Sequence, residues 1–154
     1  MYLYLVRHGE ALRKDEDPEQ GLSAEGRESI RKISAFAKGL GINVNHVYHS
    51  GKKRAMQTGL IFLESIHSDR GLLETDGLAP MDDPAIWHER ISRLNEDVML
   101  VGHLPHLAKV SSMMLCGSME TKVLDFDAGS IACLKKSDDN SWAVDWMMKP
   151  GLIQ

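Results

Sequence analysis

The chain has 154 residues, a formal net charge of −4 at pH 7 and an isoelectric point near 5.9, a balance that argues against nucleic acid or a membrane surface as its partner. Hydrophobic residues make up 43% of the chain and charged residues 26%, so we expect one domain over residues 1–154 with a buried core. No apolar run approaches the roughly 18 residues that a membrane span needs. The apolar start Met1–Val6 is too short for a signal-peptide core, and Cys116 and Cys133 form no redox spacing, which favours a cytoplasmic location.

Short strand-like runs alternate with helical patterns along the chain. In chain order the pattern predicts a strand at Tyr2–Val6, a helix from an N-cap at Ser23 to a stop at Gly39–Gly41, a strand at Val44–His49, a helix over Lys52–Ile66 and a weak strand at Leu72–Glu74. It then predicts a helix that begins at Asp83-Pro84, a buried strand at Asp97–Gly102, a helix from Pro105 through Leu115 that stops at Gly117, and two strands, Ser130–Leu134 and Trp142–Met147. This alternation predicts an α/β fold with a mostly parallel sheet covered on both faces and an antiparallel pair at one side.

Unusual polar residues follow the carboxyl ends of three of these strands. Arg7-His8-Gly9 follows the first strand, Ser50 leads to Arg54 after the second, and His103 comes directly after the buried strand. In open α/β sheets, ligands bind beyond the carboxyl ends of the strands. We therefore expect these residues to converge on one site.

Two arginines and two histidines at helix N-termini are the groups of an anion site. Arginine offers a planar fork of donors that matches phosphate oxygens, and Arg54 falls in the first turn of its helix, where the dipole also favours negative charge. A histidine in such surroundings attacks phosphorus when one ring nitrogen is unprotonated and the other is held by an acceptor. We expect Gly9 to let the backbone and a phosphate approach each other closely.

Four segments carry a resemblance to a known family: LVRHGEA at Leu5–Ala11, LSAEG at Leu22–Gly26, HSGKKRAMQTG at His49–Gly59 and LVGHLPHL at Leu100–Leu107. With them the chain resembles the histidine phosphatase superfamily, also called phosphoglycerate mutase-like. The short length, GLAPMDD at Gly77–Asp83, and DFDAGSIACL followed by WAVDWMMKPG are most similar to its small SixA-type phosphohistidine phosphatase branch. The resemblance implies a three-layer αβα sandwich around a mostly parallel sheet.

The resemblance also implies a role for each of these polar residues. His8 is expected to accept the phosphoryl group as the nucleophile, and Arg7, Arg54 and His103 to form the phosphate pocket that meets the charge on the equatorial oxygens. Water would then hydrolyse phospho-His8, with no metal and no other cofactor. The residues expected to contact the substrate beside them are Gly9, Glu10, Ser50 and Leu104.

Two departures from the family pattern bear on the substrate. The family usually has Ser-Pro before the second arginine motif, whereas this chain has Ser50 followed by Gly51-Lys52-Lys53, and we interpret both lysines as solvated. A general acid for alcohol leaving groups has no clear position, and Glu74, Asp82 and Asp83 are only candidates. Imidazole leaves far more readily than an alkoxide, so a site without a clear acid favours phosphohistidine in a protein.

Two other functions stay open at this point. The same site would serve a phosphomonoesterase of small phosphorylated metabolites if one of the candidate carboxylates supplied the acid. A non-catalytic phosphate-binding or phosphotransfer module is ranked lowest, because nucleophile, arginines and second histidine are all present. The remaining histidines do not favour a metal site: His46 and His49 should point to opposite faces of a strand, and His106 is interpreted as a rim or surface group.

Overall fold

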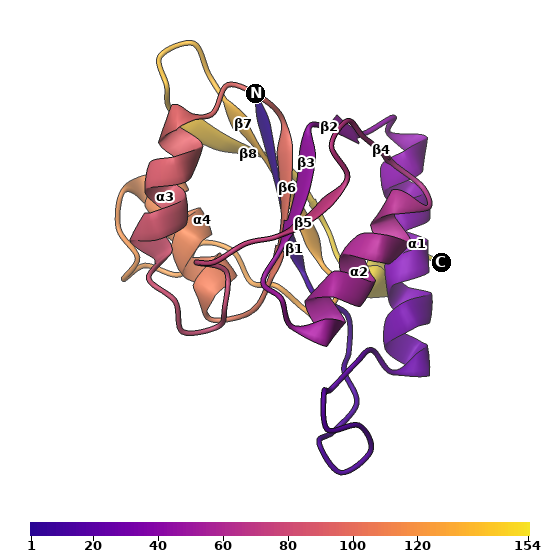
Figure 1. The fold of residues 1–154 in the computed structure, drawn as a ribbon. Helices are drawn as coiled ribbons and strands as arrows, with labels where there is room; N and C mark the ends of the chain where they lie inside the picture. Colours follow the sequence, from indigo (N-terminus) through magenta and orange to yellow (C-terminus); the bar gives the residue numbers. More distant parts are fainter.

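The protein, described over residues 1–154 by a computed structural model, is a three-layer αβα sandwich (Figure 1). This confirms the predicted fold class. The central sheet has the strand order β5-β3-β6-β1-β7-β8, with bounds β1 (Tyr2–Arg7), β3 (His46–His49), β5 (Leu72–Glu74), β6 (Val98–Gly102), β7 (Ile131–Lys136) and β8 (Trp142–Met148). The remaining elements are the helices α1 (Ala24–Gly39), α2 (Lys53–Leu63), α3 (Pro84–Arg93) and α4 (His106–Cys116), the short pair β2 (Asn43–Val44) and β4 (His67–Ser68), and the 3₁₀ helix η1 (Pro150–Leu152).

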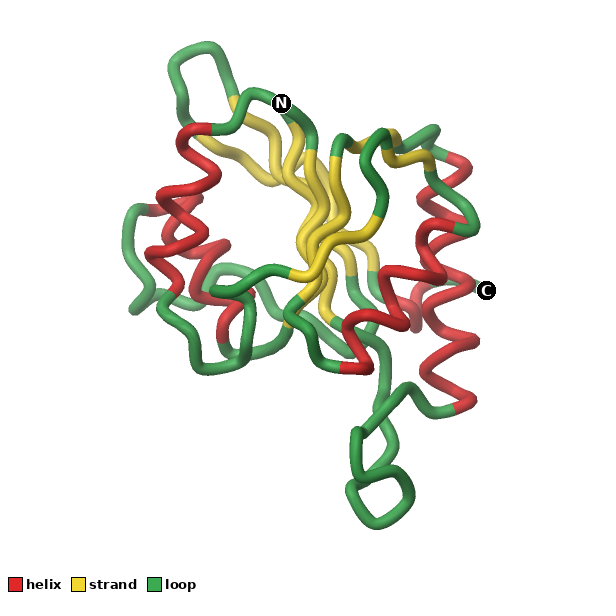
Figure 2. Tube along the Cα trace, viewed as in Figure 1, coloured by secondary structure: helices red, strands yellow, loops and turns green.

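Helices cover both faces of the sheet, with α1 and α2 on one side and α3 and α4 on the other (Figure 2). Alternation along β1 supplies both cores: Tyr4 and Val6 belong to the cluster on the α1 side, and Leu3 and Leu5 to the cluster on the α4 side. Strand β6 lies at the centre of the sheet and is buried along its whole length. Each helix therefore packs its apolar stripe against a sheet that is apolar on both faces. None of the helices combines the length and apolar composition needed to cross a bilayer.

Parallel pairing aligns the carboxyl ends of β3, β6 and β1. Strand β6 lies between the other two, with Arg7 beside Gly102 on one edge and His49 beside Val101 on the other. The segments that follow these strands thus leave the sheet side by side at one end. Strands β7 and β8 are antiparallel to their neighbours, as predicted for the end of the chain.

The helix termini follow the predicted caps. Ser23 accepts a hydrogen bond from the Gly26 N–H at 3.0 Å, and Asp83 accepts one from the Ala85 N–H at 2.9 Å. Gly117 ends α4 in the left-handed conformation, with φ of 71°. Local side-chain chemistry is sufficient to determine these three boundaries.

Two predicted elements differ in the structure. The strand predicted at Val44–His49 is interrupted at Asn45, whose N–H donates to the Asp97 carbonyl at 2.7 Å, and the residues before it pair with β4 instead of the central sheet. Helix α2 ends at Leu63 although its apolar pattern continues to Ile66. Ile66 is buried in the same core as the helix, so burial extends the pattern beyond the helical backbone.

Gly26 provides a test of how α1 sits against the chain that leaves β1. A Cβ atom at Gly26 would overlap the carbonyl oxygen of Glu10, so we expect Gly26→Ala to lower the free energy of unfolding by about 2–3 kcal/mol despite the better helix propensity of alanine. Gly39→Ala, in the same helix, is the matched control, because a Cβ there meets nothing within 4 Å. We expect this control to be neutral or slightly stabilising. Urea titration of both variants measures the difference, and equal midpoints would contradict the close approach.

Candidate active site

The backbone at Arg7 and His8 is fixed from both sides of β1. The His8 N–H donates to the Gly102 carbonyl at 3.0 Å, and the Arg7 N–H donates to the Ser130 carbonyl at 3.0 Å. The Gly129 N–H in turn donates to the carbonyls of both Arg7 and His8, at 3.1 and 3.0 Å. His8 therefore leaves the sheet from a rigid position.

The two ring nitrogens of His8 have different partners. Nδ1 lies 2.6 Å from the carbonyl oxygen of Gly9, which can only accept, so Nδ1 carries the proton. Nε2 accepts a hydrogen bond from Nε of Arg54 at 3.3 Å. The lone pair that a nucleophile needs is thus on Nε2 and faces a guanidinium.

Burial lowers the pKa of His8 to about 4, and the positive charges of Arg54 and Arg7 act in the same direction, against the hydrogen bond to Gly9. His8 is therefore neutral at pH 7. This combination of a neutral ring, an anchored Nδ1 and a directed Nε2 is the chemical state of a nucleophile rather than of a cation in an ion pair.

His103 lies against His8 from the end of β6. The ring centroids are 4.8 Å apart, and Nε2 of His103 lies 2.6 Å from Oγ of Ser50, which also accepts the Lys52 N–H at 3.3 Å. The side chain is 1% exposed, and burial lowers its pKa to about 3, with the charges of His8 and Arg54 contributing. His103 and Ser50 thus join the ends of β6 and β3 beside His8.

Arg7 lies at the same end of the sheet, and one donor of its guanidinium has no acceptor in the protein. Its Nη1 donates to the Phe126 carbonyl at 2.8 Å, whereas its Nε is buried and has no hydrogen-bond acceptor in the protein. A buried donor without a partner is uncommon and calls for an acceptor. An oxyanion in the site would supply one.

Two residues of the second arginine motif, for which no role was predicted from the sequence, form hydrogen bonds that hold α2 in place. Thr58 is fully buried, accepts the Gly9 N–H at 3.2 Å and donates to the Arg54 carbonyl at 2.8 Å. Gln57 accepts the Leu22 N–H at 2.7 Å. These side chains hold α2 against the loop after β1, and the one-turn spacing from Arg54 to Thr58 is the signal that would have revealed this role.

Three of the residues expected to contact substrate have contacts of their own within the protein, and their contact with substrate stays a prediction. The lack of a Cβ at Gly9 serves packing, because a Cβ there would lie 2.8 Å from Ile30 Cγ1 of α1, and the close approach of a phosphate to this backbone stays a prediction. Glu10 is exposed, and its side chain makes no hydrogen bond or ion pair, while its carbonyl accepts the Ser23 N–H at 2.9 Å. Leu104 is half-buried and packs against the core on the α4 side.

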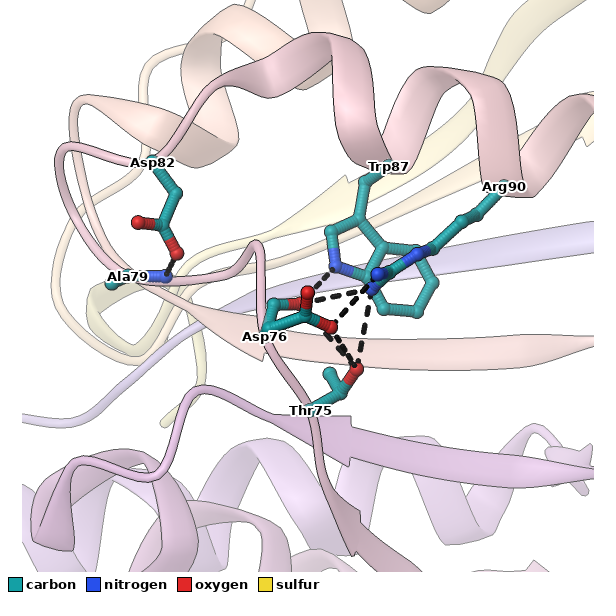
Figure 3. Close-up of polar contacts among 6 residues, drawn as sticks. All are labelled: Thr75, Asp76, Ala79, Asp82, Trp87 and Arg90. Atoms are coloured by element: carbon teal, nitrogen blue, oxygen red, sulfur yellow. Dashed lines mark hydrogen bonds and ion pairs between the residues drawn. The ribbon is translucent and has the colours of Figure 1, made fainter.

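Two of the three candidate acids are engaged in local structure. Asp82 accepts the Ala79 N–H at 2.9 Å within the loop that precedes α3 (Figure 3), and Asp83 is the N-cap of that helix. The neighbouring Asp76 is held by Arg90 of α3 at 2.8 Å, so the whole loop is tied to this helix (Figure 3).

Glu74 lies at the end of β5, against Gly51. A Cβ at Gly51 would lie 2.5 Å from Oε1 of Glu74, and Gly51 has φ of 88°. Proline cannot adopt this backbone conformation, so the loop takes a path different from one that the usual Ser-Pro would take. Glu74 thus lies against the residue that follows Ser50.

The other histidines are placed by the fold. His46 stacks on Tyr48 at 4.9 Å, and His49 points to the other face, where its Nδ1 accepts the Gly51 N–H at 3.1 Å, as expected for an odd offset on a strand. The prediction for His106 was wrong: its side chain is fully buried in the first turn of α4, under the loop that carries Asp82. The loop that covers it has no periodic sequence signal.

The buried neutral histidines predict a loss of stability in mild acid. Below pH 6.5 the unfolded chain takes up a proton on His103 that the folded chain refuses until about pH 3, so the free energy of unfolding falls with pH in this window. For His103 alone we expect a decrease of about 2 kcal/mol between pH 7 and pH 5, and His8 adds to it in the same direction. Urea titrations at both pH values should show a smaller decrease for His103→Gln than for the wild type. Equal decreases would contradict a neutral buried His103.

Comparison with known proteins identifies relatives of this arrangement. The family model described as "Histidine phosphatase superfamily (branch 1)" matches residues 3–83, which include the segments around His8 and Arg54. No curated protein matches the sequence of the chain.

Solved structures share the fold over nearly the full length. The protein histidine phosphatase SixA in complex with tungstate is 22% identical, with a TM-score of 0.87 and coverage of 99% of both chains. A candidate phosphohistidine phosphatase SixA from Agrobacterium tumefaciens is 20% identical, with a TM-score of 0.79 over 97% of this chain and 98% of that chain. A phosphoserine phosphatase variant from Entamoeba histolytica in complex with phosphoserine is 15% identical, with a TM-score of 0.68 and 95% of both chains covered. At these identities the likeness shows a common fold.

Proposed function

Because the chain belongs to the histidine phosphatase superfamily and is a phosphatase, we propose that it hydrolyses phosphohistidine in proteins through a covalent phosphoryl group on His8. The observation that carries this proposal is the state of His8, whose Nδ1 is held by the Gly9 carbonyl while its neutral Nε2 faces Arg54. Residues 1–154 then act as a single histidine phosphatase domain. A cytoplasmic location is part of the proposal, in keeping with the free thiols of Cys116 and Cys133.

The proposed reaction has two displacements at phosphorus. Nε2 of His8 attacks a substrate phosphohistidine that is protonated on its other ring nitrogen. The bond from phosphorus to the substrate's imidazole nitrogen breaks, and the electron pair of that bond stays on the ring, which leaves as neutral imidazole. Donors from Arg54, from the unpartnered Nε of Arg7 and from His103 would meet the charge on the equatorial oxygens. Water then attacks phospho-His8, which releases inorganic phosphate and restores the neutral ring.

The chemistry of the leaving group supports phosphohistidine over an alcohol ester as the substrate. Asp82 and Asp83 are committed to hydrogen bonds in the loop before α3, which removes two of the three candidates for a general acid. An imidazole with a conjugate-acid pKa near 6.5 leaves without strong acid assistance, whereas an alkoxide needs it. The similarity to the protein histidine phosphatase SixA supports the same choice.

A second candidate function rests on Glu74. Its carboxylate lies beside Gly51, one residue after Ser50, and for this second function it would have to supply the proton to an alcohol leaving group. The fold shared with a phosphoserine phosphatase supports activity on small phosphorylated metabolites through this residue.

Trapping and a substrate panel test the proposal. After rapid quenching without acid, labelled substrate should leave base-stable, acid-labile phosphate on the protein, in the presence and in the absence of a chelator. We expect kcat/KM to be higher for phosphohistidine peptides than for sugar phosphates or phosphoserine, and Glu74→Gln to leave this order unchanged. A panel led by phosphomonoesters, with loss of activity in Glu74→Gln, would support the second candidate instead. No trapped phosphate and no turnover of any substrate would contradict both.

A further inference from the structure

We propose that a basic cavity beside the catalytic site forms a second anion subsite, which selects phosphohistidine within an acidic segment of the substrate protein. The inference rests on the proposed function and extends it to the residues around the phosphoryl group. The cavity has a volume of about 600 Å³ and lies between the loop after β1 and the start of α2, with Lys14, Lys52, Lys53 and Arg54 in its wall. Met56 and Pro18 are its less polar members.

The cavity and the proposed catalytic site share Arg54. This residue lines the cavity, and its Nε also donates to Nε2 of His8 at 3.3 Å. Lys52 provides a second link, because it is close enough to His103 for its charge to help lower the pKa of that imidazole. A group bound in the cavity therefore lies next to the phosphoryl group in the same substrate.

Two of the lysines in the cavity wall have no anionic partner within the protein. Lys14 and Lys52 are exposed and form no ion pair with any carboxylate of the chain. Lys52 is the N-cap residue of α2, yet its side chain makes no capping hydrogen bond. Their charges are thus free to meet an anion.

Lys53 has a different part, because it fixes the wall of the cavity. Its Nζ lies 2.9 Å from Asp17 and 3.4 Å from Glu19, and Asp17 also accepts the Gly21 N–H at 2.9 Å. These contacts tie the loop after β1, which projects from the end of the sheet in Figure 1, to the first turn of α2. The subsite is therefore formed before substrate binds.

The mixed lining favours a protein segment over a compact polyphosphate. Glu19 and Gln20 line the cavity together with the lysines, so a dense cluster of phosphate charge would meet a carboxylate there. Single carboxylates of Asp or Glu, spaced along a peptide, fit the separate charges of Lys14 and Lys52. The amide groups of a peptide backbone would in turn use the polar atoms of Gln20.

A pair of peptides tests the subsite. One carries phosphohistidine with Asp or Glu on both sides, and the other carries Ala at those positions. For the wild type we expect kcat/KM to be about tenfold higher on the acidic peptide, mainly through KM, which is the size expected of two exposed ion pairs. In the double variant Lys14→Gln/Lys52→Gln this ratio should fall to about one, and 0.5 M salt should reduce it in the wild type. The control Lys32→Gln/Lys38→Gln changes two exposed lysines of α1 and should keep the wild-type ratio.

The subsite and the proposed function fail in different ways. Equal kcat/KM on the two peptides, or a ratio that survives in the double variant, would overturn the subsite and leave phosphohistidine hydrolysis intact. If neither peptide is hydrolysed while p-nitrophenyl phosphate is, the proposed substrate is wrong, and the subsite is then judged by inhibition. In that case phosphoserine peptides with acidic and neutral flanks compete with p-nitrophenyl phosphate, and equal inhibition constants overturn it. Stronger inhibition by a small bisphosphate than by the acidic peptide would also overturn it.

Discussion

His8→Ala is expected to reduce kcat on every substrate by about 10⁴-fold or more and to abolish the trapped phosphoprotein. The reason is that no other side chain presents an unprotonated nitrogen with an anchored partner at the end of β1. His103, the nearest imidazole, has its Nε2 on Ser50 at 2.6 Å and is not free to replace it. Steady-state kinetics on the purified variant, with circular dichroism to confirm the fold, measures the effect.

The positively charged pocket should survive this substitution. Arg54 loses the acceptor that it has on His8, so we expect His8→Ala to bind tungstate or phosphate at least as tightly as the wild type. His67→Ala is the matched control, because His67 is exposed on β4 and contacts only Asp69. Turnover of His8→Ala at the wild-type rate would show that the nucleophile lies elsewhere.

Arg54→Lys is expected to lower kcat/KM by about ten- to hundredfold although the charge is unchanged. Arg54 leaves the first turn of α2, and its Nε is directed at the nucleophilic nitrogen, so its remaining donors lie where two phosphate oxygens would bind. A lysine ammonium is a single point donor and cannot reproduce this fork. Arg54→Ala should be worse, because the site then also loses a positive charge beside a developing dianion.

A control on α1 distinguishes the loss of two-point hydrogen bonding at Arg54 from the general effect of an arginine-to-lysine substitution. Arg31→Lys changes an exposed arginine outside the site and should keep wild-type kinetics. The measurement is kcat/KM on one substrate for all four proteins, after equal circular dichroism spectra have been recorded. Wild-type kcat/KM in Arg54→Lys would place Arg54 outside the phosphate pocket.

Features that depend only on residues close together in the sequence were predictable. The caps at Ser23 and Asp83 and the stop at Gly117 follow from local chemistry, and the structure has all three. Partner choice between strands is a different matter. The chain changes partner at Asn45, from β4 before it to β6 after it, where its N–H donates to the carbonyl of Asp97, more than fifty residues later in the chain, and no local pattern contains that information.

The same division applies to the site. That the ends of three strands would converge followed from the rule for parallel sheets, and the structure brings His8, Ser50, Arg54 and His103 within contact of one another. The packing constraint on Gly9 was not predictable, because it depends on which side chain of α1 faces it, and this is Ile30. The burial of His106 likewise depends on how a loop without periodic pattern folds over it.

The order of strands in the sheet has a consequence for synthesis. Strand β6 lies between β3 and β1, although it is made long after both of them. The gap between the two earlier strands has to be filled by a late segment, which also supplies Gly102, the acceptor for the His8 N–H, and His103. A nascent chain therefore carries His8, the proposed nucleophile, from the first residues onward, yet the proposed site is incomplete until two thirds of the chain has left the ribosome and β6 has paired on both sides.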